Sequence, residues 1–240
     1  MNSLVWALEW RRARARRRLL LFNVVVPLAL VGAVSLGGAP AFHASVAYTT
    51  LFVFFGTFGS AIPLVRDAEV GWVARVSLSG WGPAAFLLQR SFAGAFLDVL
   101  QLLPSVLLIT LVAGAGGLDP IVAATALLFS LAVANLVGTW VGAIARSVAE
   151  TALFSAVVAL LLLHGSGVFR TPVPGGAGAI VERLSPFVVL HESLLALAGG
   201  PSPDAPLPMV AAAGWVLGSA LFTGVAAPWM MERLSSLRLP

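Results

Sequence analysis

The residue best suited to chemistry in this chain is Asp98, a carboxyl group inside a long apolar stretch. A charged group within a bilayer is costly and marks a functional site by default. Helical spacing places four residues on one face of that stretch: Arg90, Gly94, Asp98 and Gln101. This face predicts a polar lining or a gate for a transported molecule, with Asn135 of the next apolar stretch as a further candidate. The alternative is structural: a hydrogen bond between Asp98 and Asn135 that holds two spans together.

The remaining polar residues do not form a reactive group. His164 lies near the end of an apolar run, where a hydrogen-bonded histidine at the membrane interface is expected. His191 and Glu192 are adjacent, and adjacent residues do not face one another on a helix, so a metal site is not expected there. Cysteine is absent, which excludes thiolate ligands and nucleophiles. We therefore predict no catalytic residue, no metal and no cofactor in this chain, which is not expected to be an enzyme.

A charged island at 66–75 interrupts the apolar sequence. Each charge at the centre of a bilayer costs about 2.5–3.5 kcal/mol, so the island must lie in water at a membrane face. We expect it to begin a loop at 66–83 between two spans and to contact a partner. The candidate contact residues are Arg66, Asp67, Glu69, Gly71, Trp72 and Arg75.

The composition indicates an all-α integral membrane protein. The 240 residues are 59% hydrophobic and 10% charged, whereas soluble domains are about 45–50% apolar and about 25% charged. The apolar runs suit helices of about 20 residues better than alternating barrel strands of about 9–11. All 14 basic residues are arginine. Without lysine the chain cannot hold a P-loop, so any ATP must be bound by another protein.

Six spans are expected in one transmembrane domain that covers 1–240. A basic segment at 1–18, with Trp6 and Trp10, predicts a helix lying on the membrane surface; the alternative is a simple orientation signal. The Pro- and Gly-rich segment 169–208 is too charged for a span and predicts a broken helical excursion outside the membrane. The spans are expected at about 19–36, 45–65, 84–112, 120–145, 151–168 and 209–231.

The arginines predict the orientation. With the N-terminus inside, twelve of the fourteen lie in inner segments and only Arg170 and Arg183 lie outside. This excess predicts that both termini and the 66–83 loop are cytoplasmic, in the plasma (inner) membrane. The basic charge is thereby explained by topology and anionic membrane lipid, and no nucleic acid partner is expected.

The chain resembles the permease subunit of type-2 ABC exporters over nearly its whole length. The resemblance rests on the Arg-rich lead, the pattern Arg66-Asp67-x-Glu69-x-Gly71, and Arg90 at the start of the third span. It also rests on Ser166-Gly167-Val168-Phe169 and Ser185-Pro186-Phe187 near the Pro/Gly-rich segment. It implies six spans, an N-terminal interfacial helix and a broken outer hairpin between spans five and six.

The resemblance also implies a mechanism and partners. Two permeases, identical or homologous, would pair with two cytoplasmic ATPase subunits that bind ATP and Mg, and the 66–83 loop would hold the coupling helix. The cargo would be an amphipathic or lipid-like molecule (a drug, an antibiotic or a lipid-linked compound) moved outward. One alternative is a haem-exporter-like permease of cytochrome c maturation. Others are a stand-alone secondary transporter or channel, which would need paired broken helices at the midplane, and a membrane enzyme, which lacks a cluster of reactive residues.

Overall fold

The computed structural model describes residues 4–15, 17–113, 120–170, 182, 184–201 and 209–237. These residues form helices and no strand, so the expected all-α class is confirmed. The helices are α1 (Leu4–Ala15), α2 (Arg17–Leu36), α3 (Ala41–Glu69), α4 (Trp72–Leu78), α5 (Pro83–Ala113), α6 (Pro120–Ile144), α7 (Val148–Gly165), α9 (Pro186–Leu197) and α10 (Met209–Ser235).

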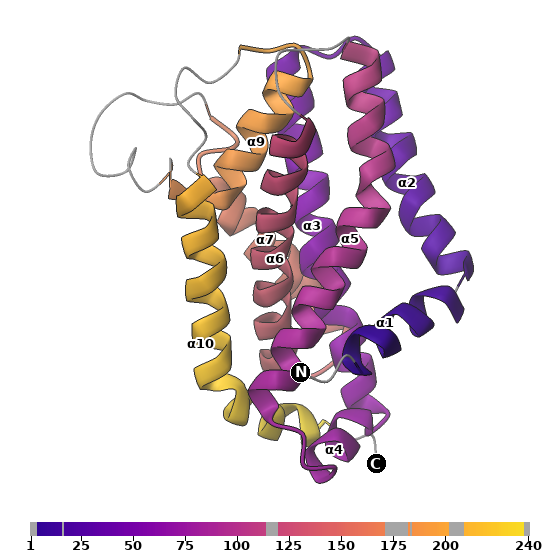
Figure 1. Cartoon of the computed structure of the whole chain (residues 1–240), viewed down its shortest axis with the longest axis vertical. Coiled ribbons are helices and arrows are strands. Elements are labelled where there is room, and N and C mark those ends of the chain that lie inside the picture. Colours follow the sequence, from indigo (N-terminus) through magenta and orange to yellow (C-terminus); the bar gives the residue numbers. More distant parts are fainter. Residues whose placement is uncertain are drawn as a thin grey trace.

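Six of these helices are long and apolar enough to cross a membrane, as the sequence predicts: α2, α3, α5, α6, α7 and α10. They run up and down as one bundle, with α9 at one end and α4 at the other (Figure 1). The 31 residues of α5 extend about 46 Å, well beyond a hydrocarbon core of about 30 Å. A helix of this length has room to project from the membrane at the α4 end.

The charged island is mostly helical, so the connection expected at 66–83 begins with the last turn of α3. α3 continues through Arg66, Asp67 and Glu69 before it ends. The break comes at Gly71, whose φ of 72° lies in the left-handed region that glycine adopts without strain. Charged residues change how deep a segment lies in the membrane, but they do not end a helix. A change in backbone conformation ends it. The short helix α4 follows directly.

Local side-chain chemistry determines where α7 and α9 begin. Ser147 caps α7 by accepting a hydrogen bond from the Glu150 backbone N–H (3.2 Å), and the Glu150 carboxylate accepts one from the Arg146 backbone N–H (2.6 Å). This reciprocal arrangement resembles a capping box and satisfies two donors at the helix start. Ser185 caps α9 by accepting a hydrogen bond from the Phe187 backbone N–H (3.3 Å), with Pro186 in the first turn.

The predicted excursion at 169–208 contains the short helix α9, which packs against α3 and α6 at one end of the bundle. Most of its side chains are buried in the protein, including His191. Arg170 forms an ion pair with Glu182 where the chain leaves α7. The other parts of the predicted excursion, 171–181, Arg183 and 202–208, lie outside the described residues.

α6 is the central helix, with the largest buried share of the six candidate spans. Its close approach to α3 depends on two glycines one turn apart, Gly138 and Gly142. A Cβ atom on Gly138 would collide with the carbonyl oxygen of Thr57, and one on Gly142 would lie 3.3 Å from the Ala61 oxygen. Small residues let helix backbones come together where apolar lipid provides no hydrophobic drive for association.

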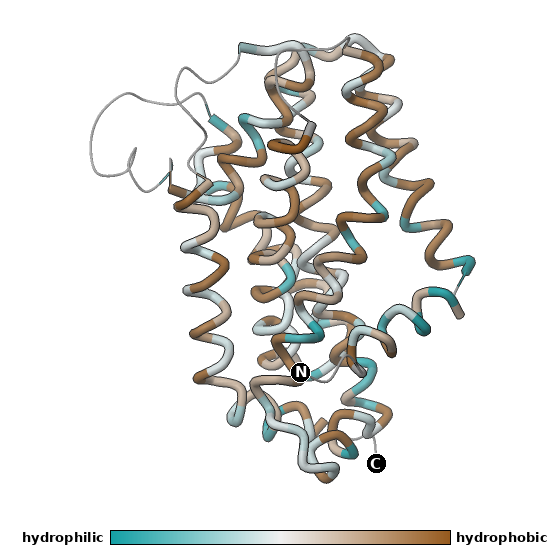
Figure 2. The backbone as a smooth tube through the Cα atoms, in the orientation of Figure 1, coloured by the Kyte–Doolittle hydropathy of each residue, from teal (hydrophilic) through white to brown (hydrophobic). Residues whose placement is uncertain are grey.

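The outer helices expose apolar faces. α2 and α10 have the smallest buried shares among the candidate spans. Figure 2 shows hydrophobic residues along both helices and hydrophilic colour on α1 and at the start of α2. The bundle therefore has the surface expected of a multi-pass membrane protein, with apolar sides suited to lipid.

The glycine contact predicts a stability difference between two matched substitutions. Gly138→Ala should lower the free energy of unfolding by about 1–3 kcal/mol, because the new methyl group must displace the α3 backbone. Gly214→Ala on α10 meets nothing within 4 Å and should be neutral or stabilising by up to about 1 kcal/mol. Thermal unfolding of the detergent-solubilised proteins measures both, and equal midpoints would contradict the role of Gly138.

Candidate functional site

The first site is a charge cluster at the α4 end of the bundle. It contains two carboxylates and two guanidinium groups: Glu9 and Arg12 of α1, Asp67 of α3 and Arg90 of α5. The four formal charges cancel, which lets them gather in a partly buried place. The cluster joins three helices that are far apart in the sequence.

The Asp67 carboxylate is the centre of this cluster. Its Oδ2 atom lies 2.8 Å from Arg12 Nη1 and 2.7 Å from Arg90 Nη1. Glu9 Oε1 lies further from the same two nitrogens, at 3.3 and 3.7 Å. The Arg90 side chain is only 8% exposed, so its charge has little access to water. A charge held this far from solvent depends on a close counter-charge, and Asp67 supplies it.

Trp72 brings α4 into the same cluster. The Arg12 guanidinium lies over its ring at 4.4 Å from the centroid, and the Arg90 guanidinium is 5.9 Å away. The ring also packs against Phe86 of α5, with centroids 5.5 Å apart. Cations over a tryptophan face are attracted by its negative quadrupole. α4 is therefore held by α1 and α5 as well as by its short connection to α3.

The structure divides the predicted contact residues into two groups. Asp67 and Trp72 face inward and bind α1 and α5. Arg66 and Arg75 are exposed, and Glu69 is half-buried with no ion pair among the described residues. Fewer than six of the predicted contact residues are thus open to another molecule.

The second site is a polar cluster between α3, α5 and α6. Asn135 Nδ2 donates hydrogen bonds to Asp98 Oδ2 (2.8 Å) and to the Leu131 carbonyl oxygen (2.9 Å). Ser60 of α3 donates to Asn135 Oδ1. The predicted hydrogen bond between Asp98 and Asn135 is confirmed, and it extends to a third helix. This bond does not decide whether the carboxyl also contacts a transported molecule.

Glycines make room for this polar cluster. A Cβ atom on Gly94 would lie 2.7 Å from Asn135 Oδ1, and one on Gly59 would lie 3.2 Å from Asp98 Oδ2. The Asp98 carboxyl therefore lies across the exposed backbone of α3 at Gly59. Larger side chains at these two positions would push the amide and the carboxyl apart.

The predicted polar face of α5 divides between the two sites. Arg90 joins the charge cluster, and Asp98 joins the polar cluster two turns further along. Gln101 is buried, and its Oε1 atom has no hydrogen-bond partner among the described residues. The four candidate residues Arg90, Asp98, Gln101 and Asn135 thus do not form one continuous lining.

The histidines do not build a reactive site. His164 is exposed near the end of α7. His191 packs its ring edge-on against Phe42, with centroids 5.5 Å apart, and burial lowers the pKa of its imidazole. Within the described part of the chain, no three His, Cys, Asp or Glu side chains are grouped to hold a metal ion.

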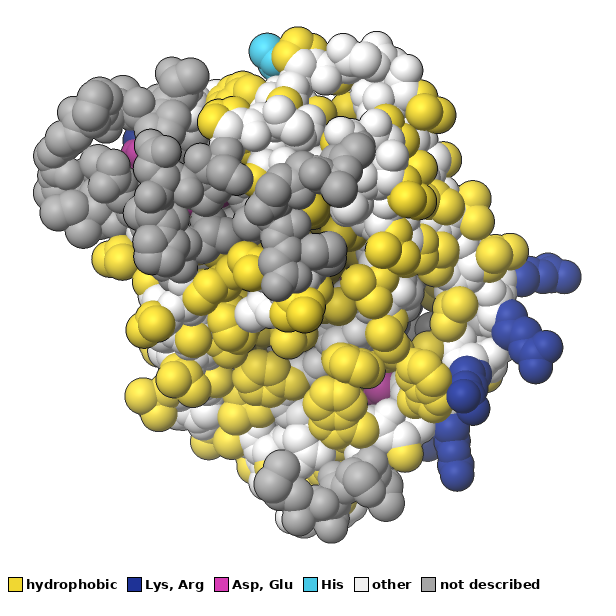
Figure 3. Space-filling view, turned by 45° about the horizontal axis from the view of Figure 1, so that its top comes forward, with side chains coloured by type: hydrophobic (Ala, Val, Ile, Leu, Met, Phe, Trp, Pro, Cys, Tyr) yellow, Lys and Arg dark blue, Asp and Glu magenta, His cyan; other side chains and the backbone are white. Residues whose placement is uncertain are grey.

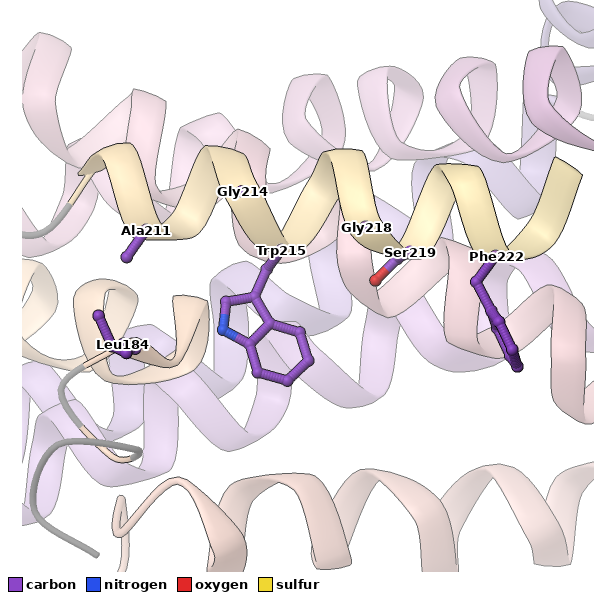
Figure 4. Close-up of a pocket in the computed structure, with 7 residues that line it drawn as sticks. All are labelled: Leu184, Ala211, Gly214, Trp215, Gly218, Ser219 and Phe222. Carbon is purple, nitrogen blue, oxygen red and sulfur yellow. The ribbon is translucent and has the colours of Figure 1, made fainter. Parts of the chain in front are cut away.

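An open hollow of about 540 Å³ lies against α10, away from both clusters. Figure 4 shows Trp215, Ser219 and Phe222 projecting from the same side of α10, with Leu184 near one end. The described residues of its lining are mainly apolar, and none of them is charged. A hollow of this kind on a membrane protein suits an acyl chain or an apolar side chain better than a polar substrate.

Sequence reasoning missed two members of the charge cluster. Arg12 was assigned only to orientation, and Glu9 had no assigned role. One signal was present: Glu9 is the only acidic residue in the first 66 positions. A lone carboxylate in a strongly basic segment indicates a specific partner. The spacing of Glu9 and Arg12 also places them on one helix face.

Comparison of the chain with family models, with curated proteins and with solved structures gives no match. Its function must therefore be inferred from its own residues.

The charge cluster predicts that α1 loosens when Asp67 loses its charge. Asp67→Asn removes the carboxylate shared by Arg12 and Arg90, and breaking such a partly buried pair should cost about 2 kcal/mol. Hydrogen exchange of the α1 amides should then become about tenfold faster or more. The matched control is Glu69→Gln in the same turn of α3, which should leave α1 unchanged. Equal exchange in the two variants would contradict the role of Asp67.

The polar cluster predicts different results for two substitutions of Asp98. In Asp98→Asn the amide oxygen can still accept the hydrogen bond from Asn135, so the thermal midpoint should remain close to that of the original protein. Asp98→Leu removes this bond and crowds the backbone at Gly59, which should cost about 1–3 kcal/mol. Thermal unfolding in detergent compares them. A loss as large in the Asn variant would show that the charge, and not the hydrogen bond, holds the helices.

Proposed function

We propose that this chain is the transmembrane subunit of an exporter driven by a separate ABC ATPase. It moves an amphipathic or lipid-like molecule outward, and two permease subunits pair in the membrane. ATP and Mg belong to the partner, because a chain without lysine cannot form a P-loop. The termini and α4 lie on the cytoplasmic side of the plasma membrane, in accord with the distribution of arginine.

The observation that carries the proposal is the exposed surface around α4. Val70 is 67% exposed and Leu78 is 83% exposed at this end of the bundle, beside the exposed side chains of Arg66 and Arg75. Exposed apolar side chains that lie together mark interaction sites, and arginine is enriched at protein interfaces. We call these four residues the α4 surface.

The support beneath this surface suits the transmission of force. Behind the α4 surface, the charge cluster and the Trp72–Phe86 contact connect α4 to α1 and α5. A short helix fixed in this way moves together with the long spans α3 and α5. An ATPase that displaces α4 would therefore displace the spans, which is what a coupling element requires.

A haem-exporter-like permease would use the same surface and differ only in cargo. A stand-alone secondary transporter or channel is the second candidate, and Asp98 is the observation that favours it, because intramembrane carboxyls often serve proton or ion pathways. In that case the α4 surface would have no ATPase partner. Isolation of the chain with its partners separates these possibilities.

The decisive experiment is affinity purification of the tagged chain from its native membranes. An ABC ATPase should co-purify with it, and recovery of none would contradict the proposal. The double substitution Arg75→Glu with Leu78→Asp should reduce the bound ATPase about tenfold or more, since it reverses a charge and adds another at the centre of the interface. Thermal unfolding should remain unchanged because both side chains are exposed.

The matched control is Arg146→Glu in the turn between α6 and α7, which reverses an exposed arginine at the same end of the bundle. It should retain the ATPase. If it lost the partner to the same extent, the attraction would be general electrostatics and the α4 surface would have no special role.

A further inference from the structure

Four exposed arginines surround the junction of α1 and α2. Arg11 and Arg14 lie on α1, and Arg17 and Arg18 are the first residues of α2. None of them forms an ion pair with a carboxylate of the described residues. Figure 3 shows basic side chains projecting together from the side of the molecule where α1 and α2 lie. We call these four residues the elbow surface.

The cations of this segment point in two directions. Arg12 turns inward to Asp67 and Glu9 in the charge cluster, whereas Arg11 and Arg14 on either side of it are exposed. Glu9 and Asp67 thus lie on the inner side of α1, and no carboxylate of the described residues pairs with the arginines on its outer side. A ligand for the elbow surface would supply the negative charge that the described residues do not provide there.

The apolar neighbours indicate what kind of ligand this is. Trp6 and Trp10 of α1 are 41% and 39% exposed, and Leu21 and Phe22 just beyond the elbow are each 62% exposed. The Arg14 guanidinium lies over the Trp10 ring at 4.9 Å from its centroid. Tryptophan and arginine together, followed at once by a lipid-facing span, match the boundary between headgroups and acyl chains. Leu21 and Phe22 belong to the candidate span α2, so they lie where acyl chains begin, a depth that a nucleic acid or a soluble acidic protein does not reach.

We propose that the elbow surface is a binding site for the headgroup phosphates of anionic phospholipids. Guanidinium groups donate paired hydrogen bonds to phosphate oxygens, and the neighbouring apolar side chains contact the upper parts of the acyl chains. Because the inner side of α1 is bound to α3, α4 and α5 through the charge cluster, headgroups on its outer side fix the elbow against the membrane surface. The site needs no ATPase and is independent of the proposed transport function.

Native mass spectrometry of the full chain in detergent tests this site, with phosphatidylglycerol or phosphatidylcholine added in increasing amounts. The original protein should bind phosphatidylglycerol in preference to phosphatidylcholine. The triple variant Arg11→Gln, Arg14→Gln and Arg18→Gln should lose about a hundredfold in affinity for phosphatidylglycerol, since each arginine near an anionic surface contributes roughly fivefold. Its affinity for phosphatidylcholine should not change.

The matched control removes three other exposed arginines, by Arg66→Gln, Arg75→Gln and Arg146→Gln. It should retain the preference for phosphatidylglycerol. An equal loss in the two triple variants would show that net charge alone attracts the lipid and would overturn the proposal. Equal binding of the two lipids by the original protein, or stronger binding of a single-stranded RNA than of phosphatidylglycerol, would overturn it as well.

Single variants keep the test open if the elbow triple variant does not fold. Arg11→Gln and Arg14→Gln each leave the other arginines in place, and each should reduce the affinity for phosphatidylglycerol by about fivefold. Unchanged affinity in both single variants would contradict the site.

Discussion

The architecture at one end of this protein depends on a single carboxylate. The Asp67 Oδ2 atom lies 2.7 Å from Arg90 Nη1 of α5 and 2.8 Å from Arg12 Nη1 of α1. Two arginines at this separation would repel each other without it, and Glu9 is too distant to replace it fully. The Trp72 ring then lies against the same cations and adds α4 to the assembly. The Asp67 carboxylate thereby links α1, α3 and α5, and through Trp72 also α4.

α5 connects this charge cluster to the polar cluster inside the membrane. It carries Arg90 in the first and Asp98 in the second, two turns apart on one continuous helix. A helix is stiff over such a distance, so under the proposed function a displacement at α4 would reach the contacts of Asp98 through α5. The Asp98 carboxyl on α5 thus lies where a movement at the α4 end of the bundle would change its distances from α3 and α6.

Packing in the membrane part follows from the absence of a hydrophobic drive between helices. α6 approaches α3 because glycines leave no side chain between the backbones, as at Gly138 and Gly142. Hydrogen bonds from Ser60 and Asn135 then fix the register of α3, α5 and α6. Lipid tails are as apolar as leucine, so close backbone contact and internal hydrogen bonds carry the specificity.

The amino-acid sequence by itself determined the class of protein, the six apolar spans and the pair Asp98 and Asn135. These follow from local composition and helical spacing, which the bilayer makes strict. Only the tertiary structure showed that Arg66 to Glu69 continue α3, because a charged run looks the same in a loop and in a projecting helix. It also decided that Asp67 and Trp72 face inward while Arg66 and Arg75 stay exposed. The partners of Asp67 are Arg12, 55 residues before it, and Arg90, 23 residues after it. Pairings over such distances depend on how the helices pack, which no local sequence pattern encodes.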